Sequence, residues 1–275
     1  MNTILSTGWR FRRAGIGVWF LALLAACTTT TTTTSGLPDG RDSRSSSEAA
    51  DPERRAAVRL ELATLYLQRG QTDTALEEVN RALAAKPDMP SAHNLRGLIL
   101  GNLGQVGAAE QAFQRALQLS PQDSGTMHNY GWFLCQQRRY AEADLQFNAA
   151  VDQPLNRDAT RSLLAQGVCQ ARAGQWVEAE RSLSRSYQLD PANPVTAFNL
   201  AEVLLHRGEL ERARFYVQRI NAIPGQVSAQ SLWLAARVER RLGNVGVLQD
   251  LGNRLRERFP ESPETLLFER GRFDD

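Results

Sequence analysis

Thiol and imidazole groups are the side chains of this 275-residue chain that offer nucleophiles, metal ligands or disulfide partners. The sequence holds three cysteines and three histidines, and no HExxH or CxxC pattern occurs among them. A catalytic or metal site needs several such groups in one place, so we predict no catalytic residue, no metal ligand and no cofactor. The six residues are Cys27, Cys135, Cys169, His93, His128 and His206.

Cys27 follows a segment typical of a secretion signal. Arg10, Arg12 and Arg13 precede an apolar stretch, residues 14–26, which is shorter than the roughly 20 residues that span a bilayer. Its length suits the apolar part of a signal peptide, which we predict over residues 1–26. Behind an ordinary secretory signal, Cys27 would be an incidental cysteine.

The sequence Leu24-Ala25-Ala26-Cys27 resembles a bacterial lipobox. This resemblance implies that Cys27 receives a diacylglycerol, that cleavage occurs before it, and that its new amine is acylated. Such multiple chains give stable anchoring. Thr28 stands where inner-membrane lipoproteins usually carry aspartate, so the resemblance implies a lipid-anchored protein of the outer membrane whose body faces the periplasm.

Residues 27–52 follow as a segment rich in threonine and serine, with an unbroken run from Thr28 to Thr34. This composition cannot bury a core, so we predict a flexible tether with a reach on the order of 25–30 Å.

The charge of the chain is nearly balanced, because 32 basic and 30 acidic side chains give a formal net charge of +2. Without the signal segment the chain is close to neutral. We therefore predict no nucleic-acid partner, and without a catalytic cluster we predict no small-molecule substrate.

Residues 53–262 repeat one pattern six times: two amphipathic segments, a short polar turn between them, and a closing proline. In the third unit Arg138 and Arg139 replace the turn glycine, and in the sixth Gly252 stands where an aliphatic or aromatic residue is expected. Small residues recur where two helices must cross closely. The first such slot holds Ala63, Gly97, Gly131, Gly167, Ala201 and Ala236, and the closing prolines are Pro87, Pro121, Pro154, Pro191, Pro224 and Pro260.

This pattern resembles the tetratricopeptide repeat, a helix–turn–helix unit of 34 residues. The resemblance implies an all-α fold in which about six units stack into a right-handed superhelix. Residues 263–275 then form a C-terminal cap or tail, with Leu266, Leu267 and Phe268 on a capping helix.

In this repeat family the first helix of each unit lines a groove that binds protein segments. The groove is expected to be apolar in the middle and basic at its C-terminal end. The arginines there either meet an acidic partner or form a solvated face, and they are Arg237, Arg240, Arg241, Arg254, Arg256 and Arg258. Each groove position has packing on an adjacent repeat as its alternative. The candidate partner-binding residues are Leu98, His128, Trp132, Leu164, Val168, Phe198, Trp233 and Arg237.

Cys135 and Cys169 lie on the first helices of neighbouring units. A disulfide requires Cα atoms within about 7 Å, which adjacent helices allow. The sequence does not fix the directions of the two side chains, so it does not decide whether a disulfide forms. We expect two free, mostly buried thiols.

The layout of lipobox, short tether and six repeats resembles the type IV pilus biogenesis/stability lipoproteins of the PilF/PilW family, the pilotins of the pilus secretin. The stretch from His128 to Cys135 resembles the third-unit helix of that family. The resemblance implies a non-enzymatic outer-membrane scaffold that binds secretin subunits and promotes their localisation and multimerisation. The alternative is a tetratricopeptide lipoprotein serving another envelope assembly, either β-barrel assembly or cell-wall maintenance.

Overall fold

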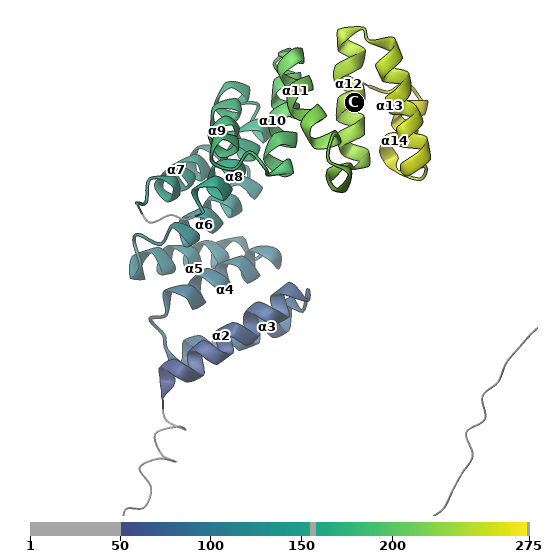
Figure 1. Cartoon of the computed structure of the whole chain (residues 1–275). Coiled ribbons are helices and arrows are strands. Elements are labelled where there is room, and N and C mark those ends of the chain that lie inside the picture. Colours follow the sequence, from purple (N-terminus) through teal and green to yellow (C-terminus); the bar gives the residue numbers. More distant parts are fainter. Residues whose placement is uncertain (1–50, 155–157, 274–275) are drawn as a thin grey trace, which may run out of the picture. The chain divides into compact units, whose positions relative to one another are not determined.

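Helical hairpins follow one another along the chain, as the spacing of the prolines predicts (Figure 1). The computed structural model describes residues 51–154 and 158–273, and these contain thirteen α-helices, one short 3-10 helix and no strand. The predicted all-α fold is confirmed for this part of the chain. The elements are α2 (Pro52–Gln68), α3 (Thr72–Ala85), α4 (Pro90–Asn102), α5 (Val106–Leu119), α6 (Ser124–Gln136), α7 (Tyr140–Val151), α8 (Ala159–Arg172), α9 (Trp176–Leu189), α10 (Pro194–His206), α11 (Leu210–Asn221), η1 (Pro224–Gln226), α12 (Ala229–Leu242), α13 (Val245–Arg258) and α14 (Pro263–Glu269).

Several of the first helices begin at a short polar residue whose side chain caps the helix N-terminus. The side chain of Asp123 accepts a hydrogen bond from the backbone N–H of Gly125, and Asn193 accepts from Val195 and Thr196. Such caps satisfy backbone donors that have no partner within the helix. Proline in the first turn of α2, α4, α10 and α14 costs nothing there, because its missing N–H has no partner in any case.

Each hairpin turns at a residue with a left-handed backbone. Gly208 and Gly243 both have φ of 76°, a conformation that glycine adopts without strain. In the third hairpin this position is Arg138, with φ of 59°, so the arginine adopts a conformation that L-residues disfavour. The neighbouring Arg139 pairs with Glu110 at 2.8 Å.

The small residues of the first slot let the two helices of a hairpin touch. A Cβ added at Gly131 would lie 3.2 Å from the Phe147 ring and 3.3 Å from the Ala143 carbonyl oxygen. A Cβ at Gly167 would lie 2.5 Å from Leu183 Cγ. Glycine at these places therefore makes room for a large side chain of the second helix, which fills the space between the two backbones.

Successive hairpins stack through their first helices, which contact one another in the order α2, α4, α6, α8, α10 and α12. Each second helix also contacts the first helix of the next hairpin. The first helices thus form a continuous wall, and the side chains on its open side are the ones available to a partner.

Helix α14 packs against both helices of the last hairpin. Its Phe268 ring lies where a Cβ at Gly252 would come within 2.3 Å. The glycine that stood in place of an apolar residue in the sixth unit therefore receives an apolar side chain from the next helix. Beyond α14, Phe273 stacks on Trp233 with 4.9 Å between ring centroids.

Cys135 and Cys169 form a disulfide between α6 and α8, so the expectation of two free thiols was wrong. Their Cα atoms are 5.9 Å apart. Cys135 lies four residues after Gly131, whereas Cys169 lies two residues after Gly167. That offset of two corresponds to about 200° around a helix, so the two side chains leave their helices on opposite sides and face each other.

The predicted signal peptide, the lipidated Cys27 and nearly all of the tether fall on residues 1–50, outside the residues that the structure describes. Their assignments stay predictions. Among the described helices, none combines the length and the hydropathy that crossing a bilayer requires.

Candidate protein-binding groove

The open side of the wall carries the side chains that the sequence analysis placed in a groove. Six of the eight candidates are half-buried, which leaves part of each apolar or charged surface available to a partner. They come from five successive first helices, α4 to α12, and therefore follow the stack from one hairpin to the next. These six are Leu98, Trp132, Leu164, Val168, Phe198 and Arg237.

Two hollows interrupt this surface near its C-terminal end. The α8–α10 hollow, of about 330 Å³, is lined by Val168, Ala171, Arg172, Trp176, Leu183, Asn199, Glu202, Val203 and His206. The α10–α12 hollow, also about 330 Å³, is lined by Phe198, Glu202, Gln230, Trp233, Leu234, Arg237 and Glu264. Glu202 belongs to both, so the hollows adjoin and together bring Val168, Phe198, Trp233 and Arg237 to one place.

Stacked cationic and aromatic groups shape the α8–α10 hollow. The guanidinium of Arg172 lies 4.9 Å from the centroid of the Trp132 ring, and Trp176 stacks on His206 with centroids 4.4 Å apart. Cation–π and stacking contacts hold these side chains in fixed orientations. Burial lowers the pKa of His206, and the nearby charges of Arg237 and Arg241 lower it further, which favours the neutral ring.

Arg237 and Glu202 form a weak ion pair in the α10–α12 hollow. Arg237 Nη1 lies 3.7 Å from Glu202 Oε1, beyond ordinary hydrogen-bond distance. Arg237 Nε is buried and makes no hydrogen bond within the described residues. Burial raises the pKa of Glu202, and the attraction of Arg237 opposes this. A buried donor without a partner is costly, so an acceptor on a bound segment would gain from pairing with Arg237.

The remaining two candidates, His128 and Trp233, are each 8% exposed. The His128 ring packs edge-on against Phe147, and its Nδ1 lies 3.2 Å from Ser162 Oγ on α8. His128 therefore lies inside the wall and does not face the groove as predicted from its spacing. Burial lowers its pKa to about 4, with a further contribution from Arg161. Trp233 is covered on one side by Phe273 but still lines the α10–α12 hollow.

The predicted basic end of the groove is largely engaged within the protein. Arg241 donates a hydrogen bond to the Leu205 carbonyl oxygen at 3.0 Å, and the Arg240 guanidinium lies 4.4 Å from the centroid of the Phe273 ring. These contacts, together with the pairing of Arg237 to Glu202, leave a smaller cationic surface than the sequence analysis considered.

Trp176 and Glu264 line the hollows but were missed as groove residues. Trp176 opens a second helix, and Glu264 belongs to the cap, so neither occupies a first-helix slot of the repeat pattern. The described residues contain no group of three or more His, Cys, Asp or Glu side chains that could hold a metal ion. The arrangement offers binding through two hollows with mixed apolar and polar linings and through one cation–anion pair.

The chain matches family models described as tetratricopeptide repeats. One matches residues 60–124 and 134–194, and another matches residues 170–235. The chain belongs to the tetratricopeptide repeat family. The matched residues contain Leu98, Leu164, Val168, Phe198 and Trp233 of the groove, whereas most of α6, with Trp132, lies between the two segments of the first match.

Its relatives include the type IV pilus assembly protein PilF of Pseudomonas aeruginosa, which is 26% identical over 224 residues, 82% of this chain and 88% of that protein. A crystal structure of PilW, described as a widely conserved type IV pilus biogenesis factor, is similar with a TM-score of 0.70 and 28% identity, covering 77% of this chain and 96% of that one. The structure of P. aeruginosa PilF has a TM-score of 0.69 and 24% identity over 81% and 100% of the two chains. This protein is thus a non-enzymatic tetratricopeptide scaffold related to PilF and PilW.

Proposed function

We propose that this protein is a type IV pilus assembly factor of the bacterial envelope. The observation that carries the proposal is the similarity to PilF, which extends over 82% of this chain and is matched by the shape similarity to PilW. The repeats supply a protein-binding surface without catalytic groups, which suits a factor that holds other proteins during assembly.

Its partner, in this proposal, is an outer-membrane secretin subunit, and its anchor is a lipid on Cys27 that leaves the repeats facing the periplasm. The disulfide between Cys135 and Cys169 supports an extracytoplasmic location, because such bonds persist in oxidising compartments. Tethering a bound subunit to the membrane raises its local concentration there, and this favours assembly of a ring from subunits.

The groove is the proposed contact surface. A segment of the partner lying along it would place apolar side chains in the α8–α10 and α10–α12 hollows and a hydrogen-bond acceptor near Arg237. Trp132 and Phe198 offer half-buried aromatic surface beside these hollows. Aromatic and arginine side chains in such positions often supply most of the binding energy of an interface.

The test is complementation of a deletion strain, with detergent-resistant secretin multimers and twitching motility as the measurements. We expect Cys27→Ala to release the protein into the soluble periplasmic fraction and to reduce outer-membrane multimers. The double variant Trp132→Ala with Phe198→Ala should stay anchored and folded but lose multimers. Phe215→Ala, at a 52% exposed phenylalanine on α11 outside the groove, is the matched control.

Normal secretin multimers in both Cys27→Ala and the double variant would contradict the proposal. If the deletion instead lowered the levels of outer-membrane β-barrel proteins or altered cell-wall composition while multimers persisted, the protein would serve one of those other envelope assemblies.

A further inference from the structure

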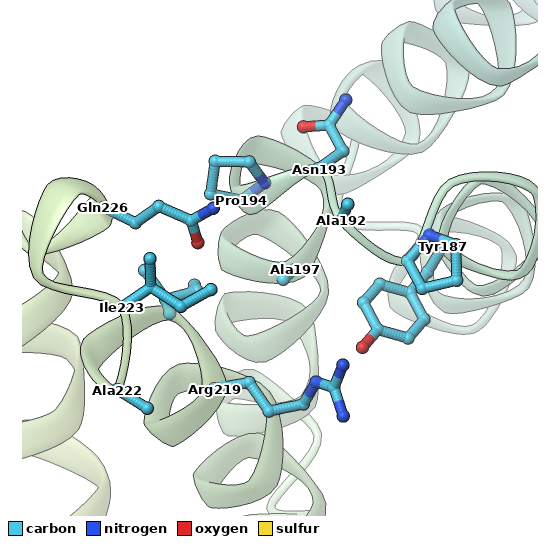
Figure 2. A pocket seen from close by; sticks show the side chains of 11 residues that line it. Tyr187, Ala192, Asn193, Pro194, Ala197, Arg219, Ala222, Ile223 and Gln226 are labelled. Carbon is cyan, nitrogen blue, oxygen red and sulfur yellow. The ribbon is translucent and has the colours of Figure 1, made fainter.

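A third and larger hollow lies away from the groove, at the end of the fifth hairpin opposite its turn at Gly208. Its volume is about 520 Å³, within the usual range of ligand sites. Figure 2 shows its walls, which come from the end of α9, the start of α10 and the end of α11. None of the residues around it is a groove candidate. They are Tyr187, Pro191, Ala192, Asn193, Pro194, Ala197, Arg219, Ile220, Ala222, Ile223 and Gln226.

Two departures from the repeat pattern create this hollow. Ala197 lies four residues before the small first-slot residue Ala201, and the other five units carry long side chains at that place, namely Arg59, His93, Met127, Leu163 and Leu232. The connection from α11 to α12 spans residues 222–228, whereas that from α9 to α10 spans residues 190–193. The alanine leaves the floor empty, and the longer loop supplies Ile223 and Gln226 as an additional wall.

The lining is apolar apart from a few polar groups that mainly donate hydrogen bonds. Arg219 is the one charged residue among them, it is exposed, and it makes no ion pair within the described residues. Figure 2 shows its guanidinium and the Tyr187 hydroxyl directed toward each other at one side of the hollow. The Asn193 side-chain oxygen already caps α10, which leaves its amide N–H groups as donors.

We propose that this hollow binds the C-terminal residue of a partner protein chain, with an aliphatic or aromatic side chain in the hollow and the terminal carboxylate on Arg219. Arginine binds carboxylates with two parallel hydrogen bonds, and no acidic side chain lines the site to compete. Arg219 and Ile220 are consecutive on α11, so cation and apolar wall adjoin. This suits a ligand whose carboxylate and apolar side chain are attached to the same carbon. The site does not depend on the groove or on the proposed pilus function.

The experiment measures binding of two labelled peptides, Gly-Ser-Gly-Ser-Ala-Phe with a free C-terminal carboxylate and the same sequence as its amide, to the purified full chain by fluorescence polarisation. We expect the acid to bind about tenfold more tightly than the amide, because the amide cannot form the charge-assisted pair with Arg219. Arg219→Gln should bring the acid to the affinity of the amide. Ala197→Leu, which restores the bulk of Leu163 at this place, should abolish binding of both.

Arg181→Gln is the matched control, because Arg181 is an exposed arginine on α9 outside the hollow, and it should leave binding unchanged. Thermal melting of each variant checks that it is folded. Equal affinity for acid and amide, or binding insensitive to Ala197→Leu in a folded variant, would overturn the proposal. Displacement of the peptide by octanoate at comparable concentration would also overturn it, because the site would then accept free carboxylic acids rather than chain ends.

Discussion

In the third and in the sixth hairpin a glycine makes room for a phenylalanine ring, but the glycine and the ring belong to different helices in the two cases. In the third, Gly131 on α6 receives the ring of Phe147 from α7, sixteen residues later in the chain. In the sixth, the first helix carries Ala236, and it is Gly252 on the second helix that receives a ring, that of Phe268, again sixteen residues later.

The difference shows how a hairpin can pack against a single short helix in place of a full neighbouring hairpin. An internal hairpin buries its second helix against the next unit, whereas α13, within the described residues, packs against the short α14. Because Gly252 has no side chain, the Phe268 ring packs directly on α13, and this contact holds α14 against α13. The cap therefore depends on a contact that mimics the one inside a hairpin, and terminal units of repeat proteins need such a cap to cover their last apolar face.

The largest expected effect is that of Gly131→Leu. The added carbons meet both the Phe147 ring and the Ala143 backbone oxygen, and a backbone atom has no alternative rotamer. We expect a loss of about 4 kcal/mol in the free energy of unfolding, above the common cost of overpacking. Urea denaturation followed by circular dichroism measures it, and an unchanged midpoint would refute the close approach of α6 and α7.

The disulfide gives the third hairpin a constraint that the described part of the sixth does not have. The bridged loop of 34 residues is long enough for a stabilisation of about 3 kcal/mol through the unfolded state. Reduction should weaken amide-exchange protection in α6–α8 and leave α12–α14 unchanged. The variant Cys135→Ser with Cys169→Ser should lack any response to the reductant. Equal loss of protection at both ends of the array would contradict this local role.

His128 makes the third hairpin sensitive to acid. Its folded-state pKa of about 4 lies below the ordinary value of 6.5, so the unfolded chain binds the proton more readily. The stability contributed by the neutral ring is present above pH 6.5 and is lost as the pH falls toward 4. We expect a loss of about 2 kcal/mol between pH 7 and pH 5. The difference between the urea midpoints of wild type and His128→Gln at the two pH values isolates this contribution, and equal pH dependence would contradict it.

Gly252→Leu should cost less than Gly131→Leu, although its added carbon would meet Phe268 at a shorter distance. The obstructing group belongs to the short terminal helix, which can separate from α13 while the other hairpins stay folded. We expect about 1.5 kcal/mol, with exchange protection lost in α14 alone. Combining Gly252→Leu with Phe268→Ala should recover stability, because the new leucine then fills the space. A double variant less stable than both single variants would refute the pairing.

The smallest effect concerns the turns. Arg138→Gly should raise the free energy of unfolding by about 0.5 kcal/mol, since relief of the left-handed backbone exceeds the entropy that glycine adds to the unfolded chain. Gly243→Ala, at the equivalent turn of the sixth hairpin, should be destabilising. Thermal melting of both variants gives the comparison, and a destabilising Arg138→Gly would mean that contacts of the arginine side chain outweigh its backbone strain.

Much of the fold could be predicted because it depends on local signals. The closing prolines follow the ends of the second helices, glycines mark most of the hairpin turns, and small residues mark the crossings. The third turn was also identified, since Arg138 and Arg139 visibly replace the glycine there.

The features that could not be predicted from the sequence depend on the directions of side chains. The facing of Cys135 and Cys169 arises from an offset of two residues between neighbouring helices, which spacing within one repeat does not reveal. His128 has the groove spacing of Trp132 but packs one turn earlier, where α8 covers it. The hollow around Ala197 had a readable signal, because an alanine stands where every other unit has a long side chain.

The covalent link between Cys135 and Cys169 also sets how the chain responds to mechanical load. Tension applied at the two ends of the polypeptide passes through the sulfur atoms and bypasses residues 136–168 between them. Fully drawn out, that segment would add about 115 Å of length. While the disulfide is intact, stretching the molecule cannot extend this segment. In a pulling experiment the fully extended chain would therefore be shorter by that amount than the chain with the disulfide reduced.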